Sequence, residues 1–388
     1  MDTNTGTAGE NIQSSCIFDL GKGEDMKLIH CADLHLDSKM TANLSTEQAK
    51  ERRAEILNTF MRMVDYANDH DVELILIAGD LFDTRNVSAT ARNAVRDAIV
   101  MHPGITFLYL KGNHDNDNFL SKLDEIPANL KLFDENWKSY RYGRIVISGL
   151  ELNAVNQVTA YNSLVLDHDD YNIVMLHGQD STYQTKDKTE VIALNELKNR
   201  NIDYLALGHI HSYKEAPLDG RGIYCYPGCL EGRGFDECGE KGFVVIDIDE
   251  KAHSMVHRFV PFSSRVLHTV QVDVSQCMTS QEAAECIRKV IEQNQYPAKS
   301  MVKFVLSGAV DIESERNTEY LAQQFSDLFY FEKVEDETTL RLDYEQYAKD
   351  ESLKGEFIRM VYASDLDEKM KPEVIRMGIQ ALSGEEFV

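Results

Sequence analysis

Short apolar runs alternate with longer amphipathic stretches from Lys27 to about Arg265. The runs are rich in Val, Ile and Leu, which is typical of strands buried on both faces of a sheet. The predicted strands cover residues 27–33, 73–80, 105–110, 144–152, 171–178 and 203–211. The stretches between them predict helices at 45–69, 88–101 and near 190–200. Because strands and helices alternate, we expect parallel strands joined by right-handed crossovers.

The pattern changes twice after this region. From Gly222 to Val260 it becomes all-β, with runs that predict hairpin-linked strands. We therefore expect the α/β class, as an α+β sandwich of two mixed β-sheets flanked by helices. From Leu267 the pattern is typical of a small α+β domain, and two acidic amphipathic helices, about 350–363 and 372–382, follow it.

These changes predict four parts of the chain. Residues 1–25 are polar and are expected to form a disordered extension, and they lack the pattern of a signal peptide. Residues 26–265 form the large domain, residues 266–345 a small C-terminal α+β capping domain, and residues 346–388 the terminal helices. No apolar run approaches the roughly 18 to 20 residues of a membrane helix, so we expect no membrane contact.

Cysteines are scattered along the chain without paired CxxC spacing. They are Cys16, Cys31, Cys225, Cys229, Cys238, Cys277 and Cys286. This usage is typical of reduced thiols, and it favours a cytoplasmic location. A zinc site formed by Cys225, Cys229 and Cys238 is the alternative, and the lack of a second pair disfavours it.

The formal net charge of −25 argues against bulk binding of a polyanion, because nucleic-acid affinity comes largely from Lys and Arg on phosphates. The charge is uneven. Residues 311–388 contain 20 Asp and Glu against 9 Lys and Arg, a net of −11. Acidic metal ligands would account for part of the remainder, so the charge weakens a DNA-binding hypothesis without excluding it.

Five polar clusters each stand where a predicted strand ends. They are Asp33-Leu34-His35, Gly79-Asp80, Gly112-Asn113-His114-Asp115, His177-Gly178 and Gly208-His209-Ile210-His211. Ligands bind beyond the carboxyl ends of strands in α/β sheets, so the five clusters can converge on one point. Carboxylate, amide oxygen and imidazole suit divalent metals such as Mn²⁺, Fe²⁺ or Zn²⁺. A lone carboxylate such as that of Asp80 can bridge two ions.

Each cluster alone also has a structural interpretation. Asp33 with His35 suits a capped turn, Gly79-Asp80 an ordinary turn, and His177 a hydrogen-bonded buried histidine. Gly112-Asn113-His114-Asp115 is a rarer sequence. All five clusters in order, each at a strand end, favour a site for two metal ions.

The order DLH, GDLFD, GNHD, H and GHIH resembles the calcineurin-like metallophosphoesterase superfamily. The segments DLHLDS, GDLFDTR, YPGCLEGRGFDECGEKGF and LKGEFIRMV are similar to the bacterial SbcD/YhaO-type DNA repair exonucleases, relatives of the archaeal and eukaryotic double-strand-break nucleases. The resemblance covers about 26–362 and is dense up to residue 262. It implies the metallophosphoesterase fold.

The resemblance also implies roles for individual residues. The first ion would take Asp33, His35, Asp80 and His211, and the second ion would take Asp80, Asn113, His177 and His209. Two divalent ions, expected as Mn²⁺ with Fe²⁺ or Zn²⁺ as alternatives, would activate a hydroxide that attacks phosphorus. His114 would be the general acid, oriented by Asp115. Asp83 stands where archaeal relatives carry a histidine.

Expected partners are DNA and an SMC-like ATPase subunit of the SbcC/YhaN type, and homologous nucleases pair as homodimers. Candidate phosphate contacts are Arg85, Arg92, Lys111 and Arg233, each of which suits a solvated surface residue equally well. Apolar stripes on the two terminal helices suit docking of the ATPase or packing on their own domain. The stripes are Leu353, Phe357, Met360 and Val361, then Val374, Ile375, Ile379 and Leu382.

The favoured function is a metal-dependent DNA nuclease, expected to be an exonuclease in DNA repair. A phosphomonoesterase or nucleotide pyrophosphohydrolase on the same scaffold is the first alternative. A non-catalytic interaction module is the second, and the complete ligand set disfavours it. A Ser/Thr protein phosphatase would read GDxxDRG, which Asp83-Thr84-Arg85 does not match.

Overall fold

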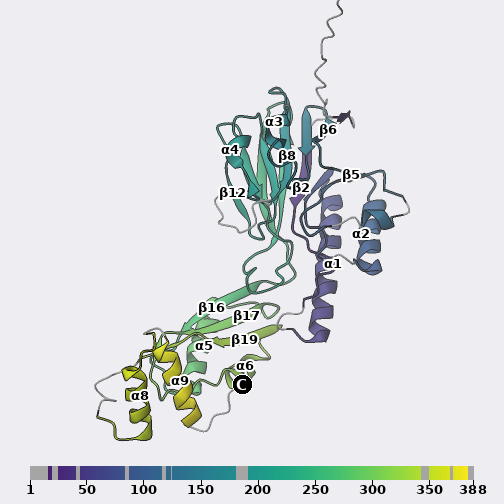
Figure 1. Cartoon of the computed structure of the whole chain (residues 1–388). Helices are drawn as coiled ribbons and strands as arrows, with labels where there is room; N and C mark the ends of the chain where they lie inside the picture. The colour runs from purple at the N-terminus through teal and green to yellow at the C-terminus, as the bar shows by residue number, and fades with distance from the viewer. Residues whose placement is uncertain are drawn as a thin grey trace, which may run out of the picture. The chain divides into compact units, whose positions relative to one another are not determined.

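The chain forms two compact units, Met1–Ser264 and Arg265–Val388. The computed structural model, drawn in Figure 1, describes residues 16–19, 25–40, 44–83, 87–115, 119–123, 125–180, 191–341, 349–367 and 370–382. Within these residues, no helix is both long enough and apolar enough to cross a membrane.

The first unit contains two mixed β-sheets. The seven-stranded sheet has the order β1-β6-β7-β8-β11-β13-β12, and the six-stranded sheet has the order β15-β14-β2-β3-β4-β5. The seven-stranded sheet consists of β1 (Cys16–Asp19), β6 (Lys138–Tyr142), β7 (Ile145–Gly149), β8 (Tyr171–His177), β11 (Tyr204–Gly208), β12 (Lys214–Pro217) and β13 (Ile223–Tyr226). The six-stranded sheet consists of β2 (Met26–Cys31), β3 (Leu74–Ala78), β4 (Thr106–Leu110), β5 (Leu130–Leu132), β14 (Gly242–Asp249) and β15 (Ser254–Pro261).

The central strands of both sheets are parallel. In the six-stranded sheet β2, β3, β4 and β5 run parallel, and β14 joins them antiparallel to β2. In the seven-stranded sheet β7, β8, β11 and β13 run parallel. Short pieces of structure connect these strands: β9 (Gln179–Asp180), β10 (Val191–Ile192) and the 3-10 helix η1 (Leu120–Lys122). Parallel strands bring their carboxyl ends to one edge, where a site can form.

Helices cover the outer faces of the two sheets (Figure 1). Helices α1 (Thr46–Asp69) and α2 (Ala89–Met101) pack on the six-stranded sheet, through residues such as Phe60 and Val95. The short helices α3 (Ala160–Ser163) and α4 (Leu194–Leu197) pack on the seven-stranded sheet. A third apolar cluster fills the space between the sheets. The expected sandwich of two mixed sheets flanked by helices is confirmed.

Local sequence explains where the two long helices begin. Ser45 caps α1 and accepts from the backbone N–H of Gln48, whose side chain accepts from the backbone N–H of Ser45. Ser88 caps α2 through the backbone N–H of Ala91. Each cap satisfies N–H groups that the first helical turn leaves without partners.

The expected disordered extension, residues 1–25, contains strand β1. Cys16–Asp19 pairs parallel with Lys138–Arg141 of β6, at the edge of the seven-stranded sheet. A four-residue strand has a weak sequence signal, because the partner edge rather than its own pattern specifies it. The other residues of the extension, except Asp25, lie outside the described residues.

The second unit is an α+β arrangement. Strands β16 (Leu267–Asp273), β17 (Met301–Ser307) and β19 (Phe331–Asp336) form a parallel sheet with β17 in the centre. Helices α5 (Ser280–Asn294) and α6 (Thr318–Phe325) pack on it through one apolar cluster. The remaining elements are the pair β18 (Ala309–Val310) and β20 (Thr339–Leu340), and the helices α8 (Leu353–Ala363) and α9 (Lys371–Leu382).

Candidate metal centre

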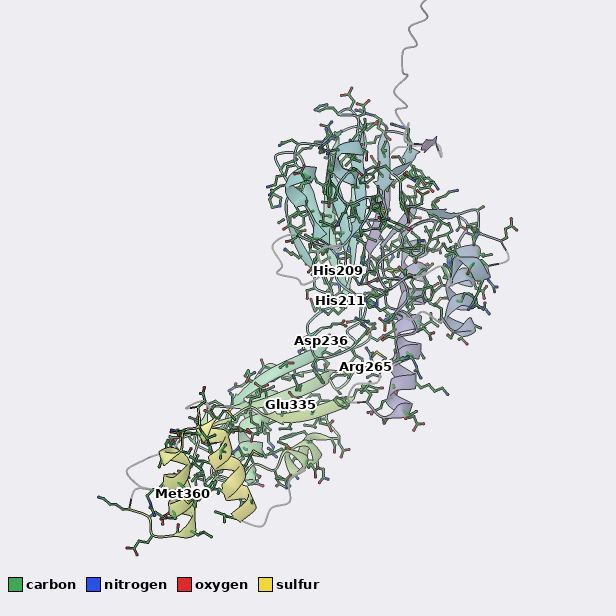
Figure 2. The ribbon with its side chains drawn as sticks, viewed as in Figure 1. His209, His211, Asp236, Arg265, Glu335 and Met360 are labelled. Atoms are coloured by element: carbon green, nitrogen blue, oxygen red, sulfur yellow. The ribbon has the colours of Figure 1, made fainter. Side chains whose placement is uncertain are left out.

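The predicted ligands follow the carboxyl ends of strands from both sheets. Asp33 and His35 follow β2, Asp80 follows β3, and Asn113 follows β4 in the six-stranded sheet. In the seven-stranded sheet His177 ends β8, and His209 and His211 follow β11. Figure 2 shows His209 and His211 at one end of the strands of the first unit. The fold therefore brings all seven predicted ligands to the same end of the sandwich.

The backbone at this end adopts a conformation that side chains rarely allow. Asp33, His35, Asp80 and His209 have positive φ angles of 52°, 44°, 52° and 102°. Backbone hydrogen bonds hold two of the loops together, from Asp33 N to the Gly79 oxygen at 3.1 Å and from His35 N to the Asp80 oxygen at 2.9 Å. Such costly conformations persist where the surroundings fix them and are concentrated at functional sites.

Two glycines let the strand ends approach each other closely. A Cβ atom on Gly79, whose φ is +94°, would stand 2.1 Å from Nδ1 of His177. A Cβ atom on Gly112 would stand 2.3 Å from a carboxylate oxygen of Asp80. Any larger residue at either position would displace a predicted ligand, so both glycines are required by the site.

The first group of donors consists of Asp33, His35 and His211, whose ligand atoms lie within 4.8 Å of one another. The two imidazole Nε2 atoms of His35 and His211 face each other at 3.1 Å. His211 Nδ1 lies 2.7 Å from Oε1 of Glu237, so it donates its proton there and presents the Nε2 lone pair. This carboxylate–histidine arrangement fixes the tautomer that binds a metal.

The second group consists of Asp33, Asp80 and His177, which meet the same 4.8 Å limit. His177 Nδ1 donates to the Ala78 carbonyl at 2.9 Å, so a neutral ring presents its Nε2 lone pair. That atom lies 3.0 Å from Oδ1 of Asn113 and 3.5 Å from Oδ2 of Asp80. Three acceptor atoms face one another here, which is stable only with a proton or a cation among them. The residues therefore fit a divalent ion.

The charges of the buried side chains at the site also favour a bound cation. Burial lowers the pKa of His177, but the carboxylates of Asp80 and Asp33 raise it to about 9. Burial raises the pKa of Asp80, but His177 and His35 hold it well below its usual range. Burial also raises the pKa of Asp33, against the effect of the neighbouring histidines. Buried anionic groups that attract positive charge this strongly are suited to metal cations.

His209 joins the site through its backbone and its ring. Its backbone N–H donates to both carboxylate oxygens of Asp33, at 2.9 and 3.0 Å. Its ring meets that of His177 edge-on, with 5.4 Å between centroids. Burial and then the positive charge of His177 lower the pKa of His209 to about 4, so the ring is neutral at pH 7 and has a lone pair for a metal.

The expected orientation of His114 by Asp115 is wrong. The Asp115 carboxylate accepts from the backbone N–H groups of Leu81, Phe82 and Gly112, so it organises the two loops. The carboxylate near His114 is that of Asp83, whose Oδ1 lies 3.5 Å from His114 Nδ1. Neighbours in the chain point in different directions here, and the buried carboxylate serves the backbone instead.

Asp83 and Glu237 contact the predicted ligands His35 and His211, although the sequence alone assigned a role to neither acid. Asp83 Oδ1 also lies 3.2 Å from Nδ1 of His35. Arg233 joins the two acids, with Nη1 3.1 Å from Asp83 and Nη2 2.7 Å from Glu237. The segment that resembles the nucleases contains Glu237, but nothing in its spacing links it to His211.

The four residues expected to contact phosphate differ from one another in their surroundings. The side chain of Arg233 is only 19% exposed, and its guanidinium bonds to two carboxylates, so it is better placed to position those acids than to contact DNA. Lys111 forms an ion pair with Glu151 at 3.2 Å, and Arg92 lies on α2. Arg85 lies outside the described residues.

The cysteine alternative has no support in the structure. Among the residues described, the groups that could hold a metal contain His and Asp only. Cys229 and Cys238 instead contact the backbone oxygens of His211, at 3.5 Å, and Phe235, at 3.2 Å.

Comparison with known proteins agrees with this geometry. The family model of the calcineurin-like phosphoesterases matches residues 26–213, a range that contains all seven predicted ligands. This part of the chain is a calcineurin-like metallophosphoesterase domain. Both groups of candidate metal donors lie in this domain, since Asp33, His35, Asp80, His177 and His211 all fall within 26–213.

Three relatives from bacteria and archaea are similar to this chain at modest identity. The uncharacterized metallophosphoesterase YhaO of Bacillus subtilis is 29% identical over 238 residues, 58% of this chain and 58% of its own length. The DNA double-strand break repair protein Mre11 of Sulfolobus acidocaldarius is 25% identical over 312 residues, 75% of this chain and 77% of that protein. The SbcD component of the nuclease SbcCD of Staphylococcus epidermidis is 24% identical over 284 residues, 64% of this chain and 73% of that protein.

Proposed function

We propose that the chain is a metal-dependent DNA nuclease, an exonuclease of DNA repair that hydrolyses phosphodiester bonds. One observation carries the two-metal part of this proposal. Oδ2 of Asp80 lies 3.7 Å from Nε2 of His35 and 3.5 Å from Nε2 of His177. A single carboxylate oxygen thus lies between the two groups of donors, where a bridging ligand is needed.

The proposed ligands divide between the two ions. Asp33, His35, Asp80 and His211 would hold the first ion, and Asp80, Asn113, His177 and His209 the second. When bound, two divalent cations, which we expect to be Mn²⁺, supply Lewis acidity and lower the pKa of a water molecule. The chain's own contribution is a rigid set of buried donors, which excludes bulk water and needs little rearrangement.

His114 is the proposed proton donor to the departing sugar oxygen. Its side chain is 48% exposed, so it can reach a substrate at the site. Its backbone N–H donates to Oδ1 of Asp80 at 2.9 Å, which fixes its position relative to the proposed bridging ligand. Oδ1 of Asp83 lies 3.5 Å from Nδ1 of His114, where it can orient the ring for proton transfer.

The choice of DNA rests on the relatives. Two of them are named as a DNA double-strand break repair protein and a component of a nuclease, and both matches extend beyond the metallophosphoesterase domain. The net charge of −25 favours local contacts at the metal site over a broad basic surface. A phosphomonoesterase or nucleotide pyrophosphohydrolase on the same scaffold is the second candidate.

A substrate comparison tests the proposal. The Mn²⁺-loaded chain is incubated with free-ended and end-blocked duplex DNA, single-stranded DNA and p-nitrophenyl phosphate. Cutting of DNA that depends on a free end supports an exonuclease. Hydrolysis of the monoester alone, with intact DNA, would contradict it and support the phosphomonoesterase.

We further propose that helices α8 and α9 dock on an SMC-like ATPase subunit of the SbcC/YhaN type. Ile358, Val361, Ile375 and Ile379 are buried in one cluster, so part of each stripe packs within the second unit. Leu353 and Met360 are 70% and 64% exposed on α8, which leaves an apolar surface.

Co-purification tests this docking. Changing Leu353 and Met360 together to Asp should abolish co-purification with the co-expressed ATPase partner. Leu328→Asp, at another exposed apolar position of the second unit, is the matched control. Unchanged co-purification of the double variant would contradict the docking surface.

A further inference from the structure

A pocket of about 170 Å³ opens beside Asn113 and His177, two ligands proposed for the second ion. Its other walls include Lys111, Glu135 and Glu151. Because two proposed ligands also line the pocket, a group held there is adjacent to the phosphate that the metals would hold. None of the roles proposed above uses this space.

One side chain holds the outer wall of the pocket in place. Nδ2 of Asn156 donates to the backbone oxygens of Glu135, at 3.0 Å, and Glu151, at 2.8 Å. Its Oδ1 accepts from the backbone N–H of Asn153 at 2.8 Å. These bonds join the loops that follow β5 and β7. The pocket is therefore preorganised, and binding a ligand costs little conformational entropy.

The charge of the walls disfavours a phosphate. Lys111 already forms an ion pair with Glu151, with 3.2 Å between Nζ and Oε2. The Glu135 side chain is exposed and adds a carboxylate, and the Asp115 carboxylate contributes another negative charge. The walls therefore offer hydrogen-bond acceptors, which suit an uncharged group with N–H donors.

The size of the pocket suits one ring. An engineered cavity of roughly 150 Å³ holds benzene, so a pocket of about 170 Å³ holds a single six-membered ring. Cytosine combines this size with an exocyclic amino group that donates to carboxylates. Thymine has the same size, but it presents the O4 oxygen at that position, which a carboxylate repels.

We infer that the pocket binds the base of the nucleotide next to the scissile phosphate, and that Glu135 makes it prefer cytosine to thymine. The inference rests on the proposed nuclease function. It names a specificity-determining residue that lies outside both the proposed ligand set and the proposed proton donor.

Two homopolymers measure this preference. The Mn²⁺-loaded chain should cut single-stranded oligo-dC with a kcat/KM at least roughly fivefold above that for oligo-dT. Glu135→Ala should bring the ratio close to one, mainly through a higher KM for oligo-dC. Asp169→Asn, an 87% exposed acid that precedes β8 at its opposite end, should keep the wild-type ratio. A wild-type ratio near one, or a ratio that Glu135→Ala leaves unchanged, would overturn the inference.

Nucleoside binding separates this inference from the nuclease proposal. Saturation-transfer NMR of deoxycytidine with the full chain, without added metal, should show transfer to the ring protons. The signal should fall in Glu135→Ala and persist in Asp169→Asn. Equal signals in all three proteins would overturn the pocket assignment. If the chain cuts neither homopolymer, the proposed function fails, and this binding measurement alone decides for or against the pocket.

Discussion

The carboxylate of Asp83 lies 3.5 Å from Nδ1 of His114. His114 is half exposed at the mouth of the site, whereas Asp83 is anchored by Arg233 at 3.1 Å. A carboxylate in this position can orient the ring of a general acid toward the group that it protonates. The relationship leads to a first prediction about proton transfer.

Asp83→Asn should lower kcat on DNA by roughly 10- to 100-fold, because general acid catalysis contributes about 10²- to 10⁴-fold. The defect should nearly vanish on bis(p-nitrophenyl) phosphate, because its leaving group needs no proton. Steady-state kinetics on both substrates measure the difference. Equal defects on both substrates would show that Asp83 acts through its contact with His35 instead.

Asp115→Asn should mainly lower the stability of the protein, unlike Asp83→Asn, which should mainly lower kcat. The Asp115 carboxylate accepts three backbone N–H groups, so the change should lower the free energy of unfolding by about 1–3 kcal/mol. Urea unfolding of the metal-free protein measures this loss. A variant of wild-type stability that specifically loses the activity on DNA would restore Asp115 to the catalytic role.

Glu237→Gln should weaken binding of the first metal ion by roughly 10- to 100-fold, the usual effect of losing a carboxylate behind a histidine ligand. The reason is the 2.7 Å contact between Glu237 and Nδ1 of His211. Isothermal titration with Mn²⁺ measures the affinity. Glu240→Gln, an exposed acid on the same loop, is the matched control and should leave it unchanged. Equal affinities of the two variants would contradict the role of Glu237.

The buried pair of Arg52 and Glu231 predicts a large effect on stability. Nη2 of Arg52 lies 3.2 Å from Oε2 of Glu231, and both side chains are fully buried. Arg52→Met should lower the free energy of unfolding by about 3–5 kcal/mol, because it leaves a buried carboxylate without its cation. Adding Glu231→Leu should recover part of that loss in urea unfolding. A single variant within about 1 kcal/mol of wild type would contradict this account.

His30 predicts sensitivity to acid. Burial lowers its pKa from 6.5 to about 3. Between these values the unfolded chain takes up a proton that the folded chain excludes, so stability falls as pH falls below 6.5. His30→Leu should be less stable at pH 7, because it removes the hydrogen bond to the Tyr204 hydroxyl, but should lose less stability on acidification. Parallel slopes of unfolding free energy against pH would contradict the assignment.

Several features of the molecule could be predicted from the sequence alone. The apolar runs specify the parallel strands, and the polar clusters mark their carboxyl ends, so the common location of the seven predicted ligands follows from pattern and topology together. Strand β1 could not be predicted, because its partner edge on β6 is remote in the chain. The local pattern of apolar and polar residues does not specify pairing with a strand that is distant in the sequence.

The surroundings of the ligands were beyond the sequence for a related reason. Asp83 and Asp115 are both acids near His114, and only the fold decides which one turns toward its ring. Likewise, the sequence suggests that Arg233 is available to bind DNA. In the folded chain Arg233 instead bonds to Asp83 and Glu237. The sequence-based predictions therefore failed mainly where charged residues from distant segments pair in the folded chain.

The most direct test of the central claim is a titration of the metal-free chain with Mn²⁺, followed by calorimetry and by elemental analysis of the bound metal. The account predicts two equivalents of Mn²⁺ in the wild type. Because Asp80 lies between the two groups of donors, Asp80→Asn should weaken both equivalents. One equivalent or none in the wild type, or an Asp80→Asn variant that binds two ions with unchanged affinity, would contradict a two-metal centre bridged by Asp80.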